Sequence, residues 1–231
     1  MTRLERYFSW VVIGMLTAAA ITRPAFGDSV DSKPILIFRV LNLAQVPADI
    51  LLEAKEHVER IYDNAQIQTI WLEGDTAVPL LAGRNILQLT ILLIPDSAAF
   101  RLGGFNDRVT GFAVGNDGIG ARRAYVFAER AKKQAMDLRG NMPNVSQKTG
   151  EGLVLGYAIA HETGHLMLPP GHSNTGVMRE RMDGNSFGEA LRGNLYFTSN
   201  QGQLMRTNIA ESVRTLEREH PRDGPERVEV K

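Results

Sequence analysis

The sequence contains no cysteine in its 231 residues. No disulfide can therefore stabilise the fold, and a lipid anchor attached to an amino-terminal cysteine is excluded. An excess of charge of either sign is also lacking, because 26 Lys and Arg residues balance 26 Asp and Glu residues. Nucleic-acid-binding domains normally present a basic surface, so we expect no nucleic-acid partner.

Long hydrophobic runs are scarce, and the longest lies near the start of the chain, at 8–21. It follows Arg3 and Arg6 and precedes Ala-Phe-Gly at 25–27, which places small residues where a signal peptidase cuts. The 14 residues of the run are fewer than the roughly 20 that span a bilayer as a helix. The sequence therefore predicts a signal peptide at 1–27, export as a secreted or periplasmic protein, and no stable membrane anchor after cleavage.

Histidine is scarce as well, yet three of the five histidines lie within twelve positions, in HETGH at 161–165 and at His172. On a helix, His161 and His165 project from one face, which suits two nitrogen ligands of one zinc ion. Glu162 lies one position round, where it can accept a proton from water activated by the metal. The pattern predicts a single catalytic Zn²⁺ held by His161, His165 and His172, with Glu162 as general base.

The surroundings of the motif favour a metal site over two histidines with structural roles. Residues 152–160 are apolar nearly all round, as in a helix buried at the centre of a domain. Placing histidine and glutamate at the end of such a helix is costly unless something binds them. Pro-Pro-Gly at 169–171 then ends the helix and turns the chain, which brings His172 towards the other two histidines.

A carboxylate could supply the third ligand in place of His172. Glu180, Asp183 and Glu189 lie at suitable distances along the sequence. The first two stand among arginines, which indicates solvated surface charge, and imidazole suits zinc. We therefore favour His172 and keep the carboxylates as the alternative.

The segment HETGHLMLPPGH at 161–172 resembles the signature of the metzincin metallopeptidases, HExxHxxGxxH, which precedes a turn that carries a methionine beneath the metal. Met178 stands where this Met-turn methionine is expected. From Gly150 onward, over about 70 residues, the chain resembles a set of secreted bacterial metzincin-like proteins. Two positions depart from the signature: Leu168 replaces the family glycine, and the third histidine comes one residue later.

This resemblance implies an α+β fold with a twisted mixed sheet of about five strands packed on two helices. One helix carries HExxH, and a short carboxy-terminal subdomain holds the Met-turn and a final helix. The resemblance also implies that an edge strand binds an extended peptide through backbone hydrogen bonds. The residues expected to do so are Gly111, Phe112, Ala113 and Val114. A flexible glycine-rich loop is the alternative for this segment.

An oxyanion donor is implied as well, because some metzincins use a tyrosine after the Met-turn. Tyr196 and Tyr157 are the candidate donors, Tyr196 the first of them, but we favour a place in the hydrophobic core for each.

Length and composition predict one domain at 28–219, which the resemblance implies is catalytic, and charge with proline and glycine predicts a disordered tail at 220–231. The expected strands are 35–41, 66–72, 86–94, 110–114 and 124–128, and the expected helices are 47–65, 150–165 and 199–219. Thr149 is expected to cap the middle helix, and 129–149 to be a connection that begins with one helical turn. His57 falls on the inner stripe of the first helix, and we expect a partly buried structural residue there.

These observations together predict a monomeric zinc metalloendopeptidase that hydrolyses peptide bonds in a peptide or protein substrate. Two alternatives keep the metal: a catalytically inactive zinc-binding secreted protein that acts as a binding module, and an amidase acting on cell-wall peptides. A third is an exported structural protein whose histidines bind nothing.

Overall fold

The computed structural model describes residues 33–74, 76, 85–102, 106, 109–115, 122–140 and 142–219. The expected signal peptide at 1–27 and the expected tail at 220–231 lie outside these residues. Among the described residues, no helix combines the length and the hydropathy that a membrane-spanning segment needs.

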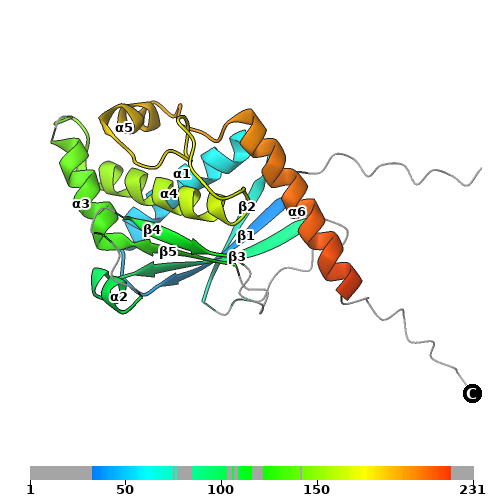
Figure 1. Ribbon diagram of the computed structural model, residues 1–231. Coiled ribbons are helices and arrows are strands. Elements are labelled where there is room, and N and C mark those ends of the chain that lie inside the picture. Colours follow the sequence, from blue (N-terminus) through cyan, green and yellow to red (C-terminus); the bar gives the residue numbers. More distant parts are fainter. Residues whose placement is uncertain are drawn as a thin grey trace, which may run out of the picture. The chain divides into compact units, whose positions relative to one another are not determined.

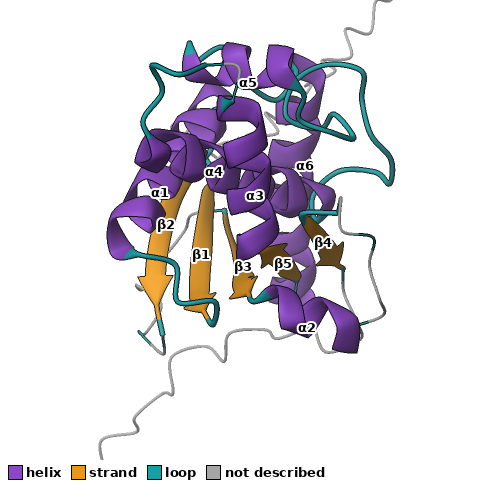
Figure 2. Ribbon diagram, turned by 90° about the vertical axis from the view of Figure 1, so that its left-hand side faces the viewer, coloured by secondary structure: helices purple, strands orange, loops and turns teal. Residues whose placement is uncertain are grey.

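A five-stranded mixed sheet with the strand order β2-β1-β3-β5-β4 forms the framework (Figure 2). Strands β1 (Ile35–Asn42), β2 (Gln68–Glu73), β3 (Ile86–Ile94) and β5 (Arg123–Phe127) run parallel. Strand β4 (Gly111–Val114) pairs antiparallel with β5 and forms one edge of the sheet. The expected α+β fold with a mixed sheet of about five strands is confirmed, including the edge position of 111–114.

Three helices cover one face of this sheet (Figure 1). They are α1 (Ala48–Asn64), α3 (Ala128–Arg139) and α4 (Gln147–His165). Alternate residues of β1 and β3, such as Phe38 and Leu89, are fully buried against them in the main core. The expectation of two covering helices was therefore too low, because α3 adds its small buried side chains Ala131 and Ala135 to the same core.

Helix α4 lies at the centre of the domain and is buried along almost its whole length, as its apolar sequence predicted. Two glycines let it approach α1 closely. A Cβ atom at Gly152 would lie 2.5 Å from the Cβ of Glu53, and one at Gly156 would lie 2.7 Å from the carbonyl oxygen of Ala54. The close packing of the two helices therefore fixes where α4 ends, and with it the position of the HETGH segment.

Three helices differ from the expectation. The segment 129–149 holds the full helix α3, whose apolar face consists mainly of alanines and so gives a weak periodic signal. Helices α2 (Asp96–Arg101) and α5 (Gly184–Leu191) are short, and neither was among the expected helices. The cap of α4 is Ser146 and not Thr149: the Ser146 side chain accepts a hydrogen bond from the Thr149 backbone N–H at 3.0 Å. Helix α6 (Ser199–Glu219) has the expected bounds.

Candidate metal centre

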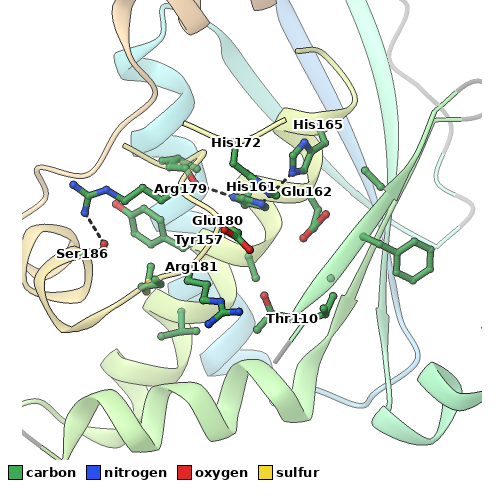
Figure 3. Close-up of a pocket in the computed structure, with 18 of the residues that line it drawn as sticks. Thr110, Tyr157, His161, Glu162, His165, His172, Arg179, Glu180, Arg181 and Ser186 are labelled. Carbon is green, nitrogen blue, oxygen red and sulfur yellow. Dashed lines mark hydrogen bonds between the residues drawn. The ribbon is translucent and has the colours of Figure 1, made fainter. Parts of the chain in front are cut away.

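The structure brings three imidazoles together at the end of α4 (Figure 3). His161 and His165 lie on the last turns of the helix, and His172 lies on the loop that follows. The Nε2 atoms of His161 and His165 are 3.1 Å apart, and one ring nitrogen from each of the three histidines lies within 4.8 Å of the others. Nitrogens at about 2.0–2.1 Å from a tetrahedral zinc ion are about 3.3 Å apart, so the two helical histidines fit the ion and His172 needs only a small side-chain adjustment.

A backbone carbonyl fixes the orientation of His161. Its Nδ1 lies 2.9 Å from the carbonyl oxygen of Val177. Because a carbonyl only accepts hydrogen bonds, Nδ1 carries the proton and donates it, which leaves the lone pair of Nε2 for a metal. This outer hydrogen bond is typical of histidines that bind metals in proteins.

Burial keeps two of these histidines in the protonation state that a metal ion requires of its ligands. It lowers the pKa of His165 to about 4, with smaller contributions from repulsion by His161 and His172. It also lowers the pKa of His161, although the hydrogen bond to Val177 acts in the opposite direction. Both rings are therefore neutral at neutral pH and free of a competing proton.

Met178 is buried and packs against the HETGH segment at Gly164. A Cβ atom at Gly164, inside HETGH, would lie 2.6 Å from the Met178 Sδ and 3.1 Å from the Phe197 ring. The turn that carries Met178 is closed by a 2.8 Å hydrogen bond from the Ser173 N–H to the Met178 carbonyl. The absence of a side chain at Gly164 thus makes room for the methionine.

Between His165 and His172 the backbone takes a positive φ at Gly171 and not at Leu168. The backbone of Leu168 stays out of the left-handed region, and its N–H donates to the Gly164 carbonyl at 3.0 Å. Gly171 has the positive φ of 119° instead. Glycine at 171 allows this backbone conformation directly before His172.

Glu162 lies in the wall of the cavity next to the histidines, with only 5% of its surface exposed. Burial raises the pKa of its carboxyl group to about 8. A bound divalent cation would lower that pKa again, because a nearby positive charge favours the carboxylate. Strand β4 packs against this side chain: a Cβ atom at Gly111 would lie 2.6 Å from the Glu162 Cγ and 2.9 Å from its Oε1. Glycine at 111 therefore allows the carboxyl group to occupy this position.

A hydrogen bond behind the site holds the middle of HETGH. The hydroxyl groups of Tyr62 on α1 and Thr163 on α4 are 2.7 Å apart, and Thr163 donates to the carbonyl oxygen of Ile159 at 2.7 Å. Both side chains are fully buried. The link orients α4 about its axis and so helps to aim the two helical histidines.

The histidines open onto a cavity of about 560 Å³ that extends along α4 (Figure 3). Three of the four residues expected to bind substrate line it: Gly111, Phe112 and Ala113. Val114 is not among the lining residues that the structure describes. The opposite wall comes from the segment 176–182 and Leu195.

The two tyrosines occupy different places. Tyr157 is buried and lines the cavity, and its hydroxyl donates to the Leu195 carbonyl at 2.5 Å. Burial raises the pKa of Tyr157, so this hydroxyl stays protonated. Tyr196 is half-buried, and the structure does not bring it to the described lining of the cavity.

The alternative carboxylates are separated from the three imidazoles or otherwise engaged. Asp183 caps α5 by accepting hydrogen bonds from the Ser186 N–H and hydroxyl, both at 2.8 Å. Glu189 lies 3.5 Å from the Arg179 guanidinium. Glu180 lines the cavity but is not part of the described group of metal-ligating atoms.

Comparison of the chain with known protein families, with curated proteins and with solved structures finds no match.

Proposed function

We propose that this protein is an exported, metzincin-like zinc peptidase that hydrolyses peptide bonds. The observation that carries the proposal is the convergence of three imidazoles beside a buried glutamate, in the lining of a cavity bordered by a sheet edge. Export rests on the signal-peptide pattern at 1–27.

Zinc bound by these histidines would supply a Lewis acid and lower the pKa of a water molecule to roughly 7. Glu162 accepts the proton of the attacking water and delivers it to the departing amine. Its position against Gly111 and inside the cavity wall holds the carboxyl group at one place during both transfers. The backbone of β4, at the free edge of the sheet, is available to pair with an extended peptide.

The experiment has two measurements on the full chain: zinc content by elemental analysis, and cleavage of a broad peptide library. We expect about one zinc per chain in the wild type and none in the His161→Ala/His165→Ala double variant. His57→Gln is the matched control, because His57 lies outside the histidine group and should leave the zinc content unchanged.

Glu162→Ala should retain zinc and lose hydrolysis, while Glu211→Ala, an exposed glutamate on α6, should keep both. Full activity of Glu162→Ala would remove the general base from the proposal. A zinc-loaded wild type that cleaves no peptide would favour the inactive binding module.

A further inference from the structure

The cavity continues beyond the histidines towards the start of α4. Its floor there consists of Val154, Tyr157 and Ala158, which share the helix face of His161 because they precede it by seven, four and three residues. At this end the Gln134 side chain on α3 donates to the Met182 carbonyl at 3.1 Å, which ties the 176–182 wall to the helix layer. The space therefore has a partly apolar floor and fixed walls, as a side-chain binding site requires.

Two arginines of the wall lie on this cavity, but only one is available to a ligand. Arg179 is engaged: it donates to the Ser186 hydroxyl at 2.7 Å and to the Asn174 carbonyl at 3.1 Å, and it lies 3.5 Å from Glu189. Arg181 is exposed and forms no hydrogen bond or ion pair within the described part of the chain. Figure 3 shows its side chain directed into the cavity, towards Thr110 on the β4 side.

Glu180 is the neighbouring charge of opposite sign, and it also lines the cavity. Glu180 makes no ion pair with Arg181 in the described structure, so the guanidinium keeps its five N–H donors free. A guanidinium presents these donors in a planar fork that matches the two oxygens of a carboxylate.

We propose that Arg181 binds a carboxylate of the substrate, so that this site selects peptides with an acidic group next to the bond that is cut. This inference rests on the proposed peptidase function and adds its substrate class. The carboxylate comes either from an aspartate or glutamate side chain or from the free carboxyl terminus of a short peptide. Arg181 is then a specificity-determining residue, separate from the metal ligands and from Glu162.

The test measures binding of three hydroxamate peptides to the zinc-loaded full chain. Each carries the hydroxamate as a zinc-binding group. The first has a glutamate and an amidated end, the second a glutamine and an amidated end, and the third a glutamine and a free carboxyl terminus. We expect the first or the third to bind about tenfold more tightly than the second, as for one charge-assisted hydrogen-bonded pair at an accessible site. Which of the two gains affinity identifies the source of the carboxylate.

Four variants test whether Arg181 and Glu180 cause the preference for a carboxylate. Arg181→Ala should abolish the difference, and Arg181→Glu should reverse it in favour of a lysine-containing hydroxamate. Glu180→Gln should increase the preference, because it removes a like charge near the bound carboxylate. Arg214→Ala is the matched control: Arg214 is exposed on α6 and lies away from the lining residues.

The outcomes separate this inference from the proposed function. Equal binding of all three peptides, or a preference that persists in Arg181→Ala, overturns the carboxylate site while the metal site stands. Failure of the zinc-loaded chain to bind any hydroxamate overturns the proposed function, and the carboxylate site with it.

Discussion

At the scale of single residues, the position of Glu162 depends on a missing side chain on another element. Gly111 belongs to β4, and a Cβ atom there would lie 2.6 Å from both the Glu162 Cγ and the Tyr125 carbonyl oxygen. The second of these contacts is with backbone, which cannot move aside cheaply. The site thus constrains residue 111 although residue 111 carries no functional group.

Gly111→Ala should therefore displace the Glu162 carboxyl group and leave the histidines in place. We expect the zinc content to stay at about one per chain and kcat/KM to fall on the order of 10- to 100-fold, as for a misplaced catalytic group. Gly115→Ala is the control, because a Cβ atom at Gly115 meets nothing within 4 Å. Equal activity of the two variants would contradict the packing described for Glu162.

His57 makes the stability of the metal-free protein depend on pH. Burial, and secondarily the charge of Arg60, lowers the pKa of His57 from its ordinary value near 6.5 to about 4. Between these values the unfolded chain binds a proton that the folded chain does not bind. The free energy of unfolding should therefore fall as the pH drops from 6.5 to 4, and change little from this group outside that window.

His57→Gln should flatten this decline by roughly 1–2 kcal/mol once solvent screening is allowed for. Urea unfolding of chelator-treated protein at pH values between 4 and 6.5 measures this change in the free energy of unfolding. The pKa values of His161 and His165 are also lowered, so these two groups also reduce the free energy of unfolding as the pH falls. Some decline should therefore remain in the variant. An unchanged slope in His57→Gln would show that this histidine titrates normally in the folded protein.

At the scale of elements, the segments with a strong hydrophobic period were predicted from the sequence. Strands β1, β2, β3 and β5 and helices α1, α4 and α6 appear with bounds close to those expected. The missed helices have weak local signals: α2 and α5 are short, and the buried residues of α3 are two alanines and Arg130. Such helices are stabilised by tertiary contacts, which local patterns do not contain.

The features of the histidine site also divide into those that the sequence predicted and those that it did not. The grouping of His161, His165 and His172 follows from spacing along one helix and one turn, so the sequence predicted it. The carbonyl of Val177 on His161, the contact of Gly111 with Glu162 and the direction of Arg181 arise from segments that meet only in the folded chain. Tyr196 was a candidate donor by resemblance alone; it packs against the hydrophobic core, as favoured, and is not among the described residues that line the cavity.

Packing of α1 on α4 leads to a prediction for the helix pair. In an open helix Gly156→Ala would gain up to about 1 kcal/mol of helix propensity. Here the added methyl group would lie 2.7 Å from the Ala54 carbonyl oxygen and 2.9 Å from the His57 Cβ, so we expect a net loss of roughly 1–3 kcal/mol in the free energy of unfolding. Gly184→Ala, at the start of α5 with no atom within 4 Å of the new Cβ, should change stability by little. Denaturant unfolding measures the stability of both variants. Equal stabilities would argue against the close approach of α1 and α4.

At the scale of the whole molecule, the large core of sheet and helices is independent of the histidines. Removing zinc with a chelator should therefore leave the far-UV circular dichroism unchanged. At zinc concentrations about 100 times Kd, binding adds about 2.7 kcal/mol, so removal should lower Tm by roughly 5–10 °C for a domain of this size.

The His161→Ala/His165→Ala double variant provides the control for this measurement, because its Tm should not respond to added zinc. Collapse of the secondary structure on chelation would show that the ion is needed for folding itself.

All three imidazoles come from the twelve residues 161–172. An ion held between them would cross-link only near neighbours, and closing so short a loop restricts the unfolded chain little. Acquisition of the fold and acquisition of the ion are therefore separable events. We therefore expect a chain that folds where zinc is scarce to gain the proposed activity only on reaching a compartment that supplies the ion.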